Sequence, residues 1–406
     1  RGAGMHGVEL IEDGGNPLVY GEWLGAPGKP TLLFYGHYDV QPPDPLEEWK
    51  SPPFEPEVRG QNIYARGASD DKGQTLILVK AVEGLMKTHG RLPVNVRFLI
   101  EGEEEVGGAH VSRFVAGKPP RLACEAAVIC DTEMFAPGLP TICTGLRGIV
   151  YGELLIEGAR QDLHSGVYGG AAPNPIQAAA EILCALKDRD GRIRIPGFLD
   201  RVRPPSPEEK AAWERLPFNE EEYREKEVGA SALTGEPEFP LFDRLWARPT
   251  IEVHGIRGGF TGEGAKTVIP ARAVVKLSAR LVPDQEPAEA AAQIERAVAA
   301  ASPRGVRAEF RPIHGAAPSL TNPSSSFIRA AARAMTEVFG RETVFIRSGG
   351  SIPIVGLFQA HLGIPSVLMG FGLPDDNLHA PNEKLHLPNF YGGIRAVARY
   401  LEILGG

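Results

Sequence analysis

The residues most able to do chemistry lie in the stretch Glu-Gly-Glu-Glu-Glu-Val-Gly-Gly at positions 101–108. This stretch directly follows residues 94–100, an apolar run that is typical of a buried strand. Carboxylates packed this densely repel one another, and no run of Lys or Arg flanks them. A metal ion is the natural counter-charge, because ligands of open α/β folds bind at the carboxyl edge of the sheet.

Further candidate ligands share one feature, which is that each lies at a predicted strand end or in the loop that follows. They are His37, Asp39, Asp70, Glu104, Glu105, Asp131 and His379. Five or six oxygen and nitrogen ligands exceed the need of one tetrahedral zinc ion and suit two ions that share a carboxylate. Imidazole and carboxylate without thiolate favour Zn²⁺, with Mn²⁺ or Co²⁺ possible. We therefore predict two divalent ions per chain.

Each signal has an ordinary structural explanation when taken alone. A Glu-rich run is usually a solvated face, and we keep that interpretation for Glu103. Asp70 and Asp71 before a helix are more often an N-cap, and Asp131 after a strand is more often a turn residue. The joint placement of these residues at successive strand ends favours the metal site over the separate explanations.

The elements that must position these residues alternate between strand and helix. Strands are predicted at 31–35, 94–100 and 126–130, and a helix is predicted to begin near residue 72. This alternation predicts an α/β domain with a mostly parallel sheet flanked by helices.

The order of the predicted strands and helices changes near residue 148. From there the order is strand, helix, strand, strand, helix, strand, which predicts a ferredoxin-like α+β domain inserted into the first. The α/β pattern returns after residue 320. We predict a discontinuous catalytic domain at 1–148 and 319–406, and a lid or dimerisation domain at 149–318.

Five segments together carry a resemblance to a known family. They are Gly36-His37-Tyr38-Asp39-Val40-Gln41-Pro42, residues 66–73 around Asp70, residues 101–105, Cys130-Asp131, and Leu378-His379-Ala380-Pro381-Asn382-Glu383. In order and spacing they are similar to the dinuclear metallopeptidases, which include carnosinases, cytosolic nonspecific dipeptidases, aminoacylases and succinyl-diaminopimelate desuccinylase. The dipeptidase and carnosinase branch is the most similar.

The resemblance implies roles for the matching positions. Asp70 bridges the two ions, His37 and Asp131 complete one metal site, and Glu105 and His379 complete the other. Glu104 is the general base, Asp39 supports the His37 imidazole, and the peptide bond between Asp70 and Asp71 is cis.

The resemblance also implies a substrate side in the inserted domain. His164, within Asp162-Leu163-His164-Ser165-Gly166, is the oxyanion candidate, and it acts on the partner subunit of a homodimer. Thr267, Arg280 and Ser351 are substrate contacts, with Arg280 facing the terminal carboxylate. His314 is a further candidate contact for which a structural role is about equally plausible.

Composition excludes several other classes of protein. The 406 residues carry a net charge of −8 and no basic block, so nucleic acid is not an expected partner. No apolar segment approaches the length of a membrane span, and no signal peptide is visible. The four Cys are expected to be buried, free thiols in a reducing compartment, which favours a cytoplasmic enzyme.

These observations predict a metal-dependent exopeptidase that hydrolyses dipeptides or short peptides. Three alternatives remain. The first is an N-acyl amino acid amidohydrolase of the same fold, and the second is a non-catalytic binding protein that retains the fold. The third is a nucleotide-binding α/β protein, which the absence of a GxGxxG or Walker motif disfavours.

Overall fold

The computed structural model describes all 406 residues, and the chain divides into two compact units. The first unit contains Arg1–Thr144, Thr321–Ile346 and Ile352–Gly406, and the second contains Gly145–Leu320 and Arg347–Ser351. The predicted bounds placed residues 347–351 in the catalytic domain, whereas here they pack with the second unit. No helix combines the length and the apolar character that a membrane crossing requires.

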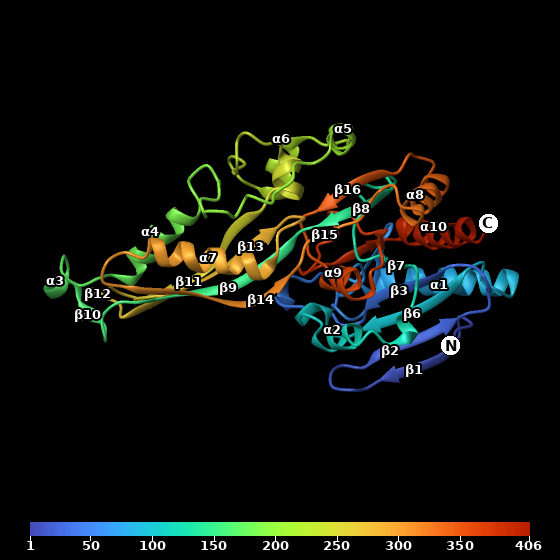
Figure 1. Cartoon of the computed structure of the whole chain (residues 1–406), viewed down its shortest axis with the longest axis horizontal. Helices are drawn as coiled ribbons and strands as arrows, with labels where there is room; N and C mark the ends of the chain where they lie inside the picture. The colour runs from blue at the N-terminus through green and yellow to red at the C-terminus, as the bar shows by residue number, and fades with distance from the viewer. The chain divides into compact units, whose positions relative to one another are not determined.

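The first unit is built on a mixed sheet (Figure 1). Its strands follow the order β1 (His6–Ile11), β2 (Leu18–Trp23), β6 (Asn95–Glu101), β3 (Thr31–His37), β7 (Ala126–Ile129), β17 (Ser366–Leu368) and β8 (Thr141–Leu146). The central strands β6, β3, β7 and β17 are parallel, while β1, β2 and β8 pair antiparallel. The prediction of a mostly parallel sheet was therefore wrong at the flanks, where hairpin-like neighbours replace helical crossovers.

Helices cover both faces of this sheet. The principal ones are α1 (Lys72–His89), α2 (Ala109–Ala116), α8 (Ser326–Phe339), α9 (Pro353–Leu357) and α10 (Leu387–Gly405). One face packs Phe34 and Val128 with Ile77 of α1, Ala331 of α8 and Tyr400 of α10 in a continuous core. Successive strand residues point to opposite faces, so Tyr35 faces the other side and contacts Phe358 edge to face. Near-complete burial on both faces accounts for the apolar strand sequences.

The remaining elements of the first unit are short. A small sheet joins β18 (Lys384–His386), β5 (Asn62–Tyr64) and β4 (Glu57–Arg59), and single helical turns lie at Leu46–Glu48, Glu104–Val106, Pro120–Leu122 and Phe358–Leu362. The chain passes between the units within β8 and β16 (Val344–Ser348) and after β15 (Ser319–Leu320).

The second unit contains a four-stranded antiparallel sheet in the order β11 (Thr250–Gly258), β13 (Arg272–Leu281), β9 (Gly148–Glu157) and β14 (Arg307–Ala316). Helices α4 (Pro175–Leu186) and α7 (Pro287–Ala301) pack on one face of it (Figure 1). Burial alternates along β9, so that Val150, Leu154 and Ile156 face the helices. The observed order strand, helix, strand, strand, helix, strand is the predicted one.

Smaller elements complete the second unit. They are β10 (Leu163–His164), α3 (Ser165–Tyr168), α5 (Pro207–Glu214), α6 (Glu220–Glu222), β12 (Val268–Ile269) and the π-helical turns Tyr223–Val228 and Asp243–Ala247. All four Cys are free, as predicted, but Cys184 is exposed and Cys124 is only partly buried, so the expectation of four buried thiols was wrong.

Candidate metal centre

The carboxyl ends of three parallel strands position the candidate ligands of the first unit. Strand β3 ends at His37, β6 ends at Glu101 just before Glu104 and Glu105, and β7 ends two residues before Asp131. In the parallel register His37 lies opposite Glu101. Gly36, the residue before His37, allows helix α1 to pack against β3, because a Cβ atom there would lie 1.9 Å from Oγ1 of Thr75 on α1. The strand ends therefore meet at one edge of the sheet, as predicted.

Two groups of ligand atoms share the carboxylate of Asp70. His37, Asp70 and Asp131 form one group and Asp70, Glu105 and His379 form the other, each with its ligand atoms within 4.8 Å of one another. His37 Nε2 lies 3.0 Å from Asp70 Oδ1, whereas His379 Nε2 lies 2.9 Å from Asp70 Oδ2. The two oxygens of one carboxylate therefore face two different imidazoles, which is the arrangement a bridging ligand needs.

The donor set fits two divalent cations. Glu105 Oε1 is buried and makes no hydrogen bond, and buried His37 Nε2 has only the carboxylates of Asp70 and Asp131 beside it. Buried polar atoms in native proteins are rarely left unpaired. Imidazole nitrogen and carboxylate oxygen are ligands of Zn²⁺, Mn²⁺ and Co²⁺ alike.

The electrostatics of the cluster also require a positive charge. Burial, followed by the negative charge of Asp131, raises the pKa of Glu104 to about 8. Burial, followed by the charge of Asp70, raises the pKa of Asp131 to about 7. Burial alone would raise the pKa of Asp70 too, but hydrogen bonds with His37 and His379 lower it. Bound cations would favour the ionised forms of all these carboxyl groups.

Asp39 contacts both the His37 ring and the backbone of the Glu104–Glu105 loop. Its Oδ1 lies 3.3 Å from His37 Nδ1, and its carboxylate accepts hydrogen bonds from the backbone N–H groups of Glu104 and Glu105 at 3.3 and 3.0 Å. A carboxylate on the second ring nitrogen fixes which nitrogen of an imidazole is free to bind a metal. One side chain thus orients both the His37 ring and the loop that carries Glu104.

Asp70 itself is held in place by Glu383, a residue for which we predicted no role. The buried carboxylate of Glu383 accepts hydrogen bonds from the backbone N–H groups of Gly67, Ser69 and Asp70 and from Arg66 Nη1, at 2.8–3.0 Å. Glu383 was part of the motif that carries the resemblance, but it received no role. A buried carboxylate that orders three backbone amides fixes the course of the chain just before the bridging residue.

Two backbone features distinguish the ligand residues. The peptide bond between Asp70 and Asp71 is cis, as the resemblance implies. His379 has a φ of 60°, a left-handed conformation that residues other than glycine rarely adopt. Asp71 is buried, and its Oδ2 accepts hydrogen bonds from the His37 backbone N–H and from Thr75 Oγ1.

The predicted substrate residues all lie in the second unit, in three separate places. Arg280 Nη1 donates to Ser351 Oγ at 2.9 Å, so these two side chains are in contact. His164 and Thr267 lie beside each other where β10 pairs with β12, and both are exposed. His314 stacks on Tyr151 at a centroid distance of 5.3 Å, and no contact links it to the other four.

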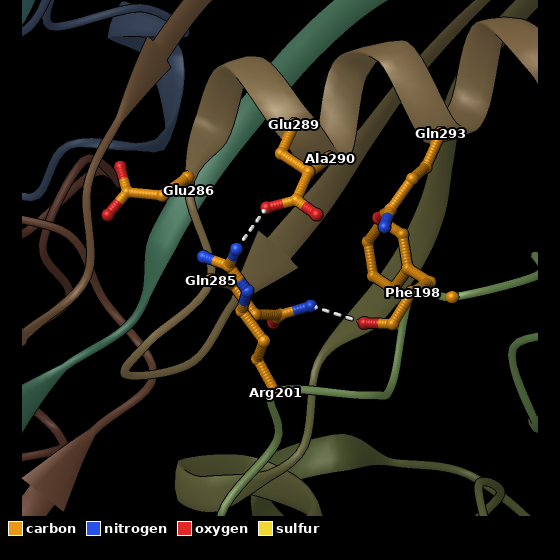
Figure 2. A pocket seen from close by; sticks show the side chains of 8 residues that line it. Phe198, Arg201, Gln285, Glu286, Glu289, Ala290 and Gln293 are labelled. Carbon is orange, nitrogen blue, oxygen red and sulfur yellow. Dashed lines mark hydrogen bonds and ion pairs between the residues drawn. The ribbon is translucent and has the colours of Figure 1, made fainter.

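A pocket beside the start of α7 in the second unit is lined by polar side chains, two of which are paired with each other. Figure 2 shows Gln285 donating to the backbone oxygen of Phe198, and Arg201 paired with Glu289. We assign it no chemistry.

Comparison with known proteins identifies the class that this fold and this cluster define. Residues 33–403 match the model of Peptidase family M20/M25/M40, and the chain belongs to this family. It is therefore a hydrolase of the peptidase class.

Two curated relatives have known activities. A Cys-Gly metallodipeptidase of Candida albicans is 34% identical over 96% of this chain and 81% of its own length. The human Beta-Ala-His dipeptidase is 33% identical over 97% of this chain and 79% of its own.

Two solved structures are similar over nearly the whole chain. The dipeptidase Dug1p of Saccharomyces cerevisiae has a TM-score of 0.84 at 31% identity, covering 99% of this chain and 88% of that one. The M20 family metallo-carboxypeptidase Sso-CP2 of Sulfolobus solfataricus has a TM-score of 0.87 at 33% identity, covering 98% and 90%. The predicted membership of the dipeptidase and carnosinase branch is confirmed by these relatives.

Proposed function

We propose that this protein is a metal-dependent dipeptidase that hydrolyses dipeptides or short peptides with two divalent ions per chain. The observation that carries the proposal is the pair of ligand groups that share Asp70. Relatives named as a Cys-Gly metallodipeptidase and a Beta-Ala-His dipeptidase support the substrate class. His37, Asp70 and Asp131 would hold one ion, and Asp70, Glu105 and His379 the other. Zn²⁺ suits this donor set, and Mn²⁺ or Co²⁺ would also fit.

Ions held by these residues would lower the pKa of a water molecule and polarise the scissile carbonyl group. Glu104 neighbours the ligand Glu105 and has no hydrogen-bond partner on its carboxylate, which leaves it free to act on the water. It accepts the proton of the attacking water and later delivers it to the leaving amine. Asp39 keeps the Glu104 loop in place through the backbone hydrogen bonds described above.

The second unit is proposed to be the ferredoxin-like lid and the dimerisation domain. Arg280 and Ser351 would bind the terminal carboxylate of the substrate, and Thr267 and His314 would contribute further contacts. His164 would reach the active site of the partner subunit of a homodimer and stabilise the oxyanion. Its Nδ1 accepts a hydrogen bond from the backbone N–H of Gly166, so Nε2 carries the proton that this role requires.

Metal content and substrate preference test this function together. The purified protein would be analysed for metals, treated with a chelator and reconstituted separately with Zn²⁺, Mn²⁺ and Co²⁺. At each stage it would be assayed with dipeptides, including Cys-Gly and β-Ala-His, with tripeptides and with N-acetyl amino acids. We expect about two ions per chain and chelator-sensitive cleavage of dipeptides. Cleavage of N-acetyl amino acids alone would replace the dipeptidase by an amidohydrolase, and a failure to take up metal would overturn the site.

A further inference from the structure

Arg147 differs from Arg347 and Arg248 of the second unit because it has no carboxylate partner. Arg347 makes a bidentate ion pair with Glu209, and Arg248 makes one with Glu236. Arg147 is partly buried, and its Nη1 is buried without any hydrogen-bond acceptor. No carboxylate lies within ion-pair distance of its guanidinium, whose Nε donates to a backbone carbonyl. A buried polar group without a partner is costly, so such groups in native proteins usually meet a ligand or an ion.

Arg147 also organises the loop that carries Ser351. Its backbone N–H donates to the Gly350 carbonyl at 3.1 Å, and its Nε donates to the Gly349 carbonyl at 3.1 Å. Its own carbonyl accepts a hydrogen bond from Ser351 Oγ at 2.5 Å. The guanidinium packs closely on the glycine at position 349, where a Cβ atom would lie 2.7 Å from Arg147 Nη2. Three hydrogen bonds thus tie the loop at residues 349–351 to one residue.

The same loop also contacts a second guanidinium group, that of Arg280. Arg280 Nη1 donates to Ser351 Oγ, and Arg280 likewise has no carboxylate within ion-pair distance. The two cations influence each other, since burial and then the charge of Arg280 lower the pKa of Arg147 to about 10, while the charge of Glu252 raises it. Both groups remain charged near neutral pH. Two like charges and a hydroxyl group, with no carboxylate within ion-pair distance of either guanidinium, are the composition of an anion-binding site.

We propose that Arg147 is the positioning residue of this anion site, and that its uncompensated charge, added to that of Arg280, makes the enzyme select substrates with a free terminal carboxylate. This inference rests on the dipeptidase function proposed above. It adds to that function a second guanidinium, which holds the Ser351 loop and raises the positive potential where the carboxylate binds.

The test compares a dipeptide with the same dipeptide whose C-terminus is amidated, which removes only the negative charge. The quantity measured is the ratio of kcat/KM for the acid to kcat/KM for the amide. Arg147→Gln should reduce this ratio by about 10- to 100-fold through a higher KM for the acid, as expected for a lost interaction with a charged group. Arg147→Lys keeps the charge and should retain an intermediate ratio. Arg272→Gln, which changes an exposed arginine at the start of strand β13, the strand that carries Arg280, is the control and should leave the ratio unchanged.

The outcomes separate the two hypotheses. If wild-type protein cleaves neither compound, the proposed dipeptidase function fails. If wild-type protein prefers the acid and Arg147→Gln lowers both rates equally, Arg147 is only structural and the inference is overturned. If Arg147→Gln does not fold, Arg147→Met decides, because it keeps a long side chain without the charge and a ratio identical to that of wild-type protein would overturn the inference.

Discussion

Replacing Glu383 by Gln should destabilise the first unit far more than a change of a single atom suggests. In the structure Oε1 accepts from the backbone N–H groups of Ser69 and Asp70 at 2.9 and 3.0 Å. Oε2 accepts from the Gly67 N–H and from Arg66 Nη1, both at 2.8 Å. An amide group keeps one oxygen, so two of the four donors would face an N–H group instead of an acceptor.

The magnitude follows from the burial of this group, which is completely enclosed. Each buried donor that loses its acceptor costs about 1–3 kcal/mol, so two such donors should lower the free energy of unfolding by about 2–6 kcal/mol. For a unit of this size that corresponds to a fall in Tm of roughly 5–20 °C. Because these amides precede Asp70, the variant should also need a higher metal concentration for saturation.

Calorimetry of the metal-free protein would measure the effect. The ligand residues all belong to the first unit, so the transition that rises on addition of metal is the transition of that unit. The matched control is Glu83→Gln on helix α1, which removes surface ion pairs with Lys80 and Lys87 and leaves no buried donor unpaired. A Glu383→Gln midpoint equal to that of the control would refute the reasoning.

Three further outcomes are expected. Glu104→Gln should still bind two ions but lose about 10²- to 10⁴-fold in kcat. Glu103→Gln should remain active, because the Glu103 carboxylate accepts hydrogen bonds from the backbone N–H groups of Asn16 and His110. Equal losses in the two variants would contradict the assignment of Glu104 as the base. His164→Ala should raise the activation barrier by about 2.7–4 kcal/mol. Mixed dimers of His164→Ala and Glu104→Gln subunits should regain activity if His164 acts across the dimer. No recovery in verified heterodimers would mean that His164 acts on the active site of its own chain. The raised pKa values of Glu104 and Asp131, about 8 and about 7, mean that the metal-free folded state binds more protons than the unfolded state. Its Tm should therefore fall as the pH rises from about 5 to 8, while a Tm that rises over this range would contradict the raised pKa values of the two carboxyl groups.

The sequence allowed the positions of the ligand residues to be predicted because strand ends can be recognised locally. His37 and Asp131 directly follow apolar runs, and the carboxyl ends of parallel strands must share an edge. The supporting residues could not be predicted in this way. Glu383 lies in a loop and resembles a solvated acid, and its importance appears only when chain segments more than 300 residues apart meet. Arg147 likewise resembles an ordinary strand arginine until the loop at 349–351 packs beside it.

The antiparallel flanks of the sheet show a second limit. Strand β8, Thr141–Leu146, is completely buried but contains two threonines, a cysteine and a glycine, so its composition gives no strong strand signal. Strand β1 lies at the sheet edge and most of its residues are exposed, so it lacks the apolar pattern of a buried strand. Both strands form because they pair with neighbouring strands of the folded sheet, and the local sequence pattern does not reveal this pairing. The sequence therefore predicted a mostly parallel sheet, whereas the structure has antiparallel strands at its flanks.

Each unit carries buried or partly buried charges that lack a counter-charge within the protein. In the first unit, buried carboxyl groups such as Glu104 and Asp131 lack a cation, and the proposed metal ions would supply it. In the second unit, the guanidinium groups of Arg147 and Arg280 lack an anion, and a free carboxylate would supply it. A ligand without a free carboxylate would leave both arginines without an anion, so the proposed site would discriminate against amidated peptides.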